Sequence, residues 1–230
     1  MLWGAERLRG ELQKPSIRVS KRTIQKYMRR VRPPGKRGQI WRTFLRNHRS
    51  DIWACDFLQL YDVLFRPIFA LLFVVHGTRE VVHFNVTRHP TDAWVAQQLR
   101  EATPWGHAPR YLVRDNDDKF GKRFTAVAEG TGIEVVRIPP RSPNLNSICE
   151  RFLGSVRREC LDHVVILSER QLRRVLKEYV ENYFNSARPH QGLNQRIPSA
   201  AKPRSVVPAG DKVVEFPILG GLHHDYRLAA

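Results

Sequence analysis

The chain has 230 residues, 42% of them hydrophobic, and its 39 basic and 22 acidic side chains give a formal net charge of +17. This hydrophobic content supports a packed core and excludes a mainly disordered chain, and without a run of about 18 apolar residues no membrane span is expected. The three cysteines form no Cys-x-x-Cys pair, which excludes a disulfide scaffold and a four-cysteine zinc site. The strongly positive net charge predicts a polyanionic partner.

The basic charge is concentrated at the start of the chain. Residues 1–50 carry 15 of the 39 basic side chains but only 2 of the 22 acidic ones. Two short stretches there have helical apolar spacing, and the second presents a basic and polar face made of Lys21, Arg22, Gln25, Lys26, Arg29 and Arg30. We predict a partial helix-turn-helix DNA-binding segment at residues 1–32, with an ordinary amphipathic helix pair as the open alternative. Residues 33–48, rich in Pro, Gly and basic side chains, read as a basic linker.

From about residue 52 the pattern changes to strands. Three adjacent strands are predicted at 52–60, 67–75 and 81–86, followed by a helix over 91–102, a strand over 110–115, a helix over 119–130 and a strand over 132–138. Two further amphipathic helices follow residue 143, and a capping box at 168–171 opens the second of them. This order predicts an α/β fold, a mixed sheet flanked by helices, with the core at residues 49–203 and a tail at 204–230.

Three carboxylates stand out in the predicted core. Asp56 shares a strand face with apolar residues, where a carboxylate must be paired, protonated or bound to a cation. Asp115 ends a strand, and ligand sites in α/β sheets gather at the carboxyl ends of strands. Glu150 follows with 34 residues between it and Asp115, on the flank of an amphipathic helix. Together they could bind hard divalent cations, although a lone strand aspartate is more often an edge residue or an ion-pair member.

Basic side chains accompany these acids. We expect Lys119, Arg151, Arg157 and Arg158 to contact phosphates near the predicted metal site. The alternative for the helix arginines is simple pairing with acids of the same helix, such as Glu159 and Asp162.

Several segments resemble a known family. WACDFL (53–58), RDND (114–117), NSICERFLGSVRRECLDH (146–163) and YFNSARPHQGLNQRIP (183–198) are similar to the catalytic core of DDE transposases and retroviral-type integrases, in particular to integrase-core proteins of bacterial insertion sequences. The resemblance implies an RNase H-like fold preceded by a helix-turn-helix remnant. It also implies that Asp56, Asp115 and Glu150 are the metal-binding catalytic triad, with Asp117 as a competing candidate for the second acid.

The same resemblance implies an activity. Proteins of this kind use Mg²⁺, or Mn²⁺ as a substitute, to cleave DNA at the ends of the element and to join the exposed 3′-hydroxyl to target DNA. We therefore expect DNA as the partner, a homo-oligomer on DNA and, because the charged first residues contain no apolar signal core, a cytoplasmic location. Two alternatives stay open, an RNase H-like nuclease that does not join strands and a truncated remnant that binds DNA without catalysis.

Overall fold

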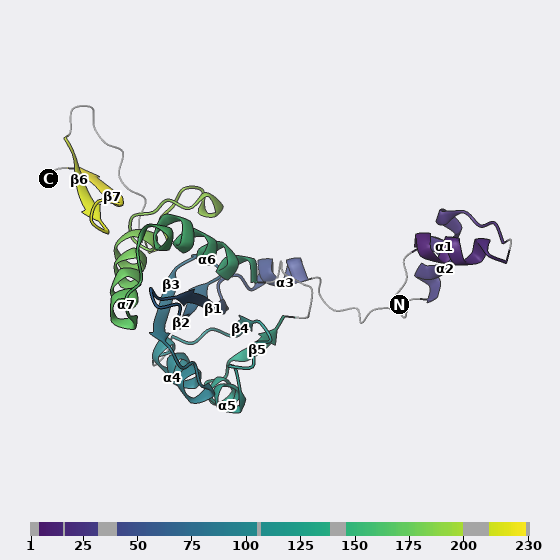
Figure 1. Ribbon diagram of the computed structural model, residues 1–230, viewed down its shortest axis with the longest axis horizontal. Helices are drawn as coiled ribbons and strands as arrows, with labels where there is room; N and C mark the ends of the chain where they lie inside the picture. The colour runs from purple at the N-terminus through teal and green to yellow at the C-terminus, as the bar shows by residue number, and fades with distance from the viewer. Residues whose placement is uncertain are drawn as a thin grey trace. The chain divides into compact units, whose positions relative to one another are not determined.

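The computed structural model describes residues 5–15, 17–31, 41–104, 107–138, 146–199 and 212–228. The chain divides into two compact units, Met1–Phe44 and Leu45–Ala230. The first unit contains α1 (Ala5–Gln13) and α2 (Lys21–Val31), which pack on each other (Figure 1). Ile24 is buried between them, and the Ser20 hydroxyl accepts a hydrogen bond from the Thr23 N–H at the start of α2. That this pair acts as a helix-turn-helix remnant stays a prediction.

Part of the predicted linker is helical. The short helix α3 (Trp41–Asn47) occupies the end of the stretch expected to be linker, and residues 32–40 lie outside the described part of the chain. The predicted boundaries of the linker and tail are therefore untested and are kept as predictions.

A five-stranded sheet forms the centre of the second unit. Its strands are β1 (Ile52–Tyr61), β2 (Pro67–Val75), β3 (Val81–Thr87), β4 (Tyr111–Arg114) and β5 (Glu134–Arg137), in the order β3-β2-β1-β4-β5. β1, β2 and β3 are antiparallel, whereas β4 and β5 run parallel to β1. The mixed sheet confirms the predicted fold class, because two hairpins followed by helical crossovers give this mixture of directions.

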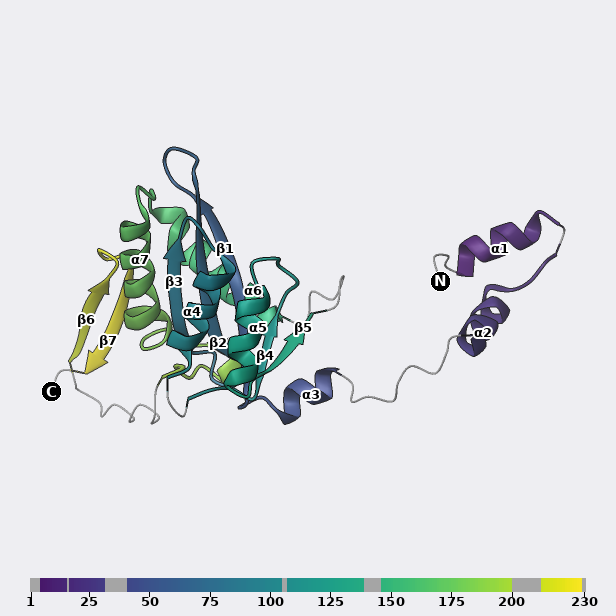
Figure 2. The ribbon, with the colours of Figure 1, turned by 90° about the horizontal axis from the view of Figure 1, so that it is seen from below.

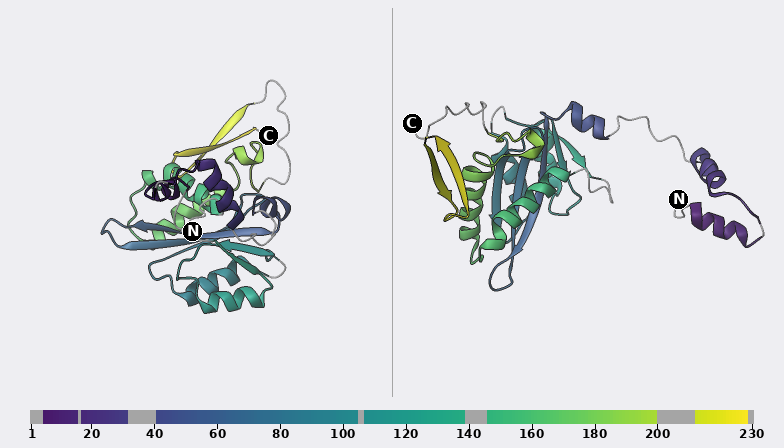
Figure 3. Two further views of the ribbon diagram at one scale, coloured as in Figure 1. Left: turned by 90° about the vertical axis from the view of Figure 1, so that its right-hand side faces the viewer. Right: turned by 90° about the horizontal axis from the view of Figure 1, so that it is seen from above.

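Helices cover both faces of the sheet (Figure 3). α4 (Asp92–Ala102) and α5 (Lys122–Gly130) cover one face, where Cys55, Phe73, Leu99 and Phe124 belong to a single buried cluster. α6 (Ser147–Glu159) packs on β1 and β2 from the other face, and α7 (Glu169–Lys177) packs on β3. Because strand side chains alternate, the neighbours Cys55 and Asp56 belong to opposite faces, which puts Asp56 on the side of α6.

The end of the chain adds structure that the sequence did not indicate. After η2 (Leu161–His163) and α7, the helix widens into the π-helical segment η3 (Glu178–Phe184), which is followed by η4 (Gln191–Leu193). Within the predicted tail, β6 (Val213–Ile218) and β7 (His223–Leu228) form a hairpin beside η3 (Figure 2). The His223 ring stacks on Tyr183 with a centroid distance of 3.9 Å. In the described part of the chain, no helix is long and apolar enough to cross a bilayer.

Candidate active site

The first two acids lie side by side on neighbouring parallel strands. β1 and β4 are in register at Ala54 and Val113, so two residues further along Asp56 is level with Asp115. Asp56 is still within β1, whereas Asp115 immediately follows the last residue of β4. Since β4 ends at this point, the sheet leaves space beyond its carboxyl end for the Asp115 side chain and for a ligand.

Asn146 connects the third acid to this pair. Its side chain is 4% exposed, and its Nδ2 donates a hydrogen bond of 3.0 Å to Asp56 Oδ2 and one of 3.5 Å to the Cys55 carbonyl oxygen. Asn146 directly precedes α6, and Glu150 is in the first turn of that helix. The contact therefore holds the start of α6, with Glu150, against the strand that carries Asp56. Sequence reasoning missed Asn146, although its position one helical turn before Glu150 was a usable signal.

Burial and neighbouring carboxylates raise the pKa of Asp56. The pKa of Asp56 is raised from 3.8 to about 7. Burial is the largest cause, the 2.8 Å hydrogen bond from the Phe57 N–H opposes it, and the charges of Asp115, Glu150 and Asp117 add to the increase. These four acids are thus near enough to interact electrically. A carboxylate whose pKa is raised mainly by burial and by like charges is stabilised when a cation is added between them.

The oxygen atoms of Asp56, Asp115 and Glu150 suit a divalent metal ion, but the three side chains do not converge on one point. Within the ranges that the structure describes, no three His, Cys, Asp or Glu side chains converge closely enough to hold a metal ion. Glu150 is exposed, and its carboxylate must move toward the two aspartates to complete the set. The available atoms are carboxylate oxygens, which hard cations prefer, and the buried Asn146 Oδ1 is a further oxygen without a hydrogen-bond partner among the described residues.

The contacts of Asp117 separate it from Asp115. The Asp117 carboxylate pairs with Lys119, whose Nζ lies 2.7 Å from Oδ2 and whose backbone N–H donates to Oδ1 at 2.9 Å. The Asp115 carboxylate accepts only the Asp117 N–H, at 3.2 Å, in the described part of the chain. The better-satisfied Asp117 is therefore the weaker candidate for the second acid. The Lys119 ammonium also lies 5.1 Å from the centroid of the Phe57 ring, so this predicted DNA contact is engaged within the protein.

The predicted basic residues of α6 are differently engaged. Arg151 donates from Nε to the Ser147 carbonyl at 2.9 Å and remains exposed. Arg157 donates from Nη2 to the Gln59 carbonyl at 2.9 Å, which pins α6 to β1 while leaving the side chain exposed. Neither arginine pairs with an acid among the described residues, so both keep charge for an anion.

Pairing of Arg158 with acids of its own helix is not observed. Glu159 instead binds Arg188, with Arg188 Nε 2.8 Å from Oε2 and Nη2 2.6 Å from Oε1, and accepts the Tyr179 hydroxyl at 2.9 Å. Arg158 is exposed and forms no ion pair within the described ranges. Arg188 therefore acts as a clasp between the RPHQGL segment, residues 188–193, and α6.

The predicted DNA-binding face of α2 belongs to the other unit and is treated alone. Lys21 pairs with Glu6 of α1 at 2.9 Å, between two half-exposed side chains. The other predicted residues of this face with described side chains, all exposed, are Arg22, Gln25 and Lys26. The side chains of Arg29 and Arg30 lie outside the described part of the structure.

With this geometry established, comparison with known proteins is informative. Residues 131–198 match the model of the family described as an integrase core domain. This chain is also similar to proteins of bacterial insertion elements. It is 33% identical over 180 residues, 77% of its length, to an uncharacterized 39.2 kDa protein of insertion element IS476 from Xanthomonas euvesicatoria. It is 29% identical over 165 residues, 70% of its length, to an uncharacterized 31.7 kDa protein of insertion element IS407 from Burkholderia multivorans. The chain spans 50% and 58% of these relatives.

Solved structures confirm the fold. A chain of the simian T-cell lymphotropic virus intasome is similar with a TM-score of 0.55 and 14% identity, covering 96% of this chain and 83% of that one. The catalytic domain of Mos1 transposase, solved with Raltegravir and Mg, has a TM-score of 0.52 and 15% identity, covering 61% of this chain and 75% of that domain. At these identities the likeness establishes the fold alone, which is the RNase H-like fold of integrase and transposase catalytic cores.

Proposed function

We propose that this integrase-core protein is a DDE-type polynucleotidyl transferase that cleaves DNA at insertion-element ends and joins the 3′-hydroxyl to target DNA. The observation that carries the proposal is the level pairing of Asp56 and Asp115 on β1 and β4, with Asn146 holding the start of the Glu150 helix against Asp56. The similarity to insertion-element proteins supports DNA as the substrate class.

In this proposal Asp56, Asp115 and Glu150 hold divalent metal, Mg²⁺ or Mn²⁺. When bound, such ions polarise a phosphodiester, assist deprotonation of the attacking water or 3′-hydroxyl and stabilise the leaving oxygen. The chain's own residues supply the negative charge that binds the cation, and Asn146 fixes Asp56 in place. Strand transfer of this type needs no covalent protein–DNA bond, so no Ser or Tyr nucleophile is assigned.

In this proposal DNA is bound by the basic residues around the site and by the predicted helix-turn-helix segment at residues 1–32. Arg151 and Arg157 are exposed and unpaired with acids in the described structure, which suits them to phosphates beside Glu150. Residues 1–32 form a separate DNA-binding segment in the proposal. Two element ends must meet for transposition, so we expect a homo-oligomer on DNA.

The test is strand transfer with pre-cut duplexes made from the DNA that flanks the gene. Asp56→Asn, Asp115→Asn and Glu150→Gln should each reduce the rate of joining about a thousandfold or more, since each removes a ligand worth several kcal/mol in the transition state. Asp118→Asn is the matched control, because this neighbouring carboxylate is exposed and predicted to have no role. Joining that persists in any of the three triad variants refutes the assignment.

The same assay separates the alternatives. Cleaved but unjoined DNA would identify a nuclease, and metal-independent binding without any turnover would identify a non-catalytic remnant. Asp117→Asn decides the second acid: activity near that of the wild type supports Asp115, whereas a loss equal to that of Asp115→Asn contradicts the role assigned by the Lys119 contact.

A further inference from the structure

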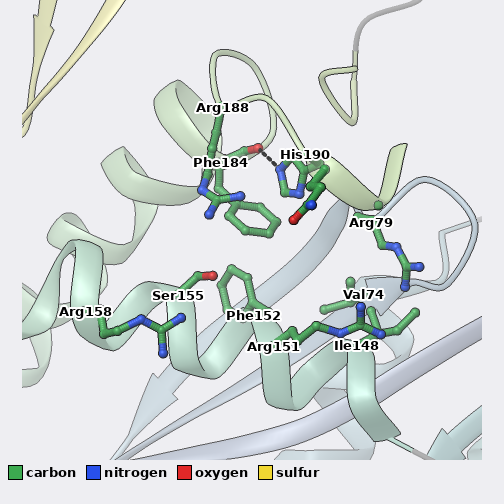
Figure 4. Close-up of a pocket in the computed structure, with 12 residues that line it drawn as sticks. Val74, Arg79, Ile148, Arg151, Phe152, Ser155, Arg158, Phe184, Arg188 and His190 are labelled. Atoms are coloured by element: carbon green, nitrogen blue, oxygen red, sulfur yellow. Dashed lines mark hydrogen bonds between the residues drawn. The ribbon is translucent and has the colours of Figure 1, made fainter. Parts of the chain in front are cut away.

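A pocket of about 260 Å³ lies beside α6, between that helix and the RPHQGL segment. Its lining is divided by chemistry. Apolar side chains of Val74, Ile148, Phe152 and Phe184 contribute to it, as do the guanidinium groups of Arg79, Arg151, Arg158 and Arg188. Figure 4 shows that Arg151 and Arg158 extend from α6, that Phe184, Arg188 and His190 form the opposite wall, and that Arg79 enters from one end.

Positive charge in this pocket is not balanced. The lining contains no acidic side chain, and among its arginines only Arg188 has an acidic partner in the described structure, Glu159. Arg79 is half-buried, and its Nη1 is buried without a hydrogen-bond partner among the described residues. Burial, followed by the charges of Arg49 and Arg151, lowers the pKa of Arg79 to about 10. Buried guanidinium groups are normally hydrogen-bonded, so a vacant donor aimed at a cluster of cations is unusual.

The backbone holds Arg79 there at a cost. Its φ is +68°, in the left-handed region that residues other than Gly, Asn and Asp rarely adopt. Such a conformation costs about 1 kcal/mol or more, and functional sites are where it is typically retained. The turn between β2 and β3 thus directs an arginine into the pocket against local preference.

The pocket lies on a different face of α6 from Glu150. Successive helical residues are about 100° apart, so Arg151 and Arg158 are both about a quarter turn from Glu150, and Ser155 is further round. Arg151 and Arg158 are seven positions apart in the sequence, so their Cα atoms are about 10 Å apart along the helix axis. A strand with several phosphates and sugars can contact each of these arginines and the apolar floor at once, so it suits the pocket better than a single inorganic phosphate. Arg49 and Arg196 line an adjacent hollow that shares Gly192 with the pocket, which extends the basic track.

We propose that this pocket binds the sugar–phosphate backbone of a DNA strand, with Arg79 and the two α6 arginines on phosphates and the apolar floor against sugar or base. The inference rests on the proposed function for the identity of the strand. It adds a DNA contact from the β2–β3 turn and the RPHQGL segment, on a face of α6 that does not carry the triad.

Binding of duplex DNA by the full chain, measured by fluorescence anisotropy in EDTA so that no cleavage occurs, tests the proposal. Arg79→Gln should weaken binding about tenfold at low salt, as expected for one lost charged contact, and should reduce the slope of log K against log salt by about 0.9. Arg174→Gln is the matched control, since this exposed arginine of α7 lies outside the pocket, and it should change the affinity less than twofold. Equal losses in the two variants overturn the proposal, because they would show a response to net charge alone.

A second variant guards against misfolding of Arg79→Gln. A Cβ added at Gly192 would lie 4.0 Å from Arg79 Nη2, an ordinary contact, so Gly192→Glu can place a carboxylate beside the vacant guanidinium donor. We expect Gly192→Glu to raise the melting temperature and to weaken DNA binding about tenfold or more, while Gly192→Gln changes either property much less. Unaltered DNA binding in Gly192→Glu overturns the proposal.

Inorganic phosphate distinguishes the source of the anion. If millimolar phosphate stabilises the wild type but not Arg79→Gln, and DNA affinity is the same in both, the pocket is a free-anion site and the proposal is wrong. Failure here is distinct from failure of the proposed function. Arg79-dependent binding without strand joining refutes only the proposed function, whereas joining with normal DNA affinity in Arg79→Gln refutes only the pocket.

Discussion

Replacing Asp56 by asparagine should stabilise the metal-free protein at neutral and alkaline pH, even though it removes a proposed catalytic group. Burial, with further contributions from Asp115, Glu150 and Asp117, raises the pKa of Asp56 to about 7 from its ordinary 3.8. Between these two values the folded state binds more protons than the unfolded state, so the free energy of unfolding falls as pH rises through this window. The penalty is complete above pH 7 and absent below pH 3.8.

The size of the effect follows from the shift. A displacement of about 3 pKa units corresponds to about 4 kcal/mol at 1.36 kcal/mol per unit. Because water reaches part of the Asp56 side chain and the site can relax, we expect Asp56→Asn to gain about 2–4 kcal/mol at pH 8. Asp56 accepts from the Phe57 N–H on Oδ1 and from Asn146 Nδ2 on Oδ2, whereas the substituted amide has a single accepting oxygen. The packing of α6 on β1 is retained if that oxygen keeps the Phe57 N–H and the Asn146 amide turns so that its vacant Oδ1 accepts from the new NH2 group.

Urea unfolding in EDTA at pH 4 and pH 8 measures this gain. Asp56→Asn should exceed the wild type at pH 8 and match it near pH 4, while Asp118→Asn, an exposed control, should match the wild type at both. Added Mg²⁺ should stabilise the wild type and not Asp56→Asn, because a bound cation removes the like-charge penalty. A variant less stable than the wild type at pH 8 in EDTA would show that Asp56 is not an electrostatically strained carboxylate.

Three further predictions concern single contacts. Asn146→Ala removes the hydrogen bond to Asp56, so strand transfer should fall about tenfold while DNA affinity in EDTA is unchanged; equal rates would contradict a positioning role. Asp92→Ala should reduce the free energy of unfolding by about 2–4 kcal/mol in chemical denaturation, because Asp92 caps α5 by accepting the backbone N–H groups of Gly121, Arg123 and Phe124. Arg188→Lys keeps the charge but breaks the two-pronged contact with Glu159, and we expect a loss of about 1–3 kcal/mol; a loss below 0.5 kcal/mol would exclude the clasp role.

The mixed sheet was predictable from the sequence because each strand carries its own local signal. Apolar runs and alternation mark β1 and β2, and the N-caps of α4 and α7 are formed by Thr91 and Ser168, as their sequence context indicates. The hairpin of β6 and β7 was not predictable in this way. Its strands are short and largely exposed, and it is held by distant contacts such as that of His223 with the Glu159 carbonyl.

The candidate site was likewise predictable only where the sequence carries a local signal. Asp56 could be placed within a strand and Asp115 at a strand end from pattern alone, and their adjacency follows from β1 and β4 being parallel neighbours. The engagement of Lys119 by Asp117 and the unpaired state of Arg158 depend on rotamers and on contacts across the fold, which spacing does not specify. A role for Arg79 could not be predicted from the sequence for the same reason, because only the left-handed turn directs its side chain into the pocket.

α6 joins two sites of opposite charge on its two exposed sides. Glu150 and the aspartates form a negative cluster that a divalent cation would neutralise, whereas Arg79, Arg151 and Arg158 form a positive cluster that phosphates would neutralise. The helix is fixed against β1 by Asn146 at its start and by Arg157 near its end, so neither cluster can relieve its repulsion by moving the helix away from the sheet. Both ligands should therefore stabilise the same helix. Since a cation and a polyanion bound about a quarter turn apart on one rigid helix also attract each other, we expect metal and DNA to bind with positive cooperativity, each increasing the affinity for the other by the same factor.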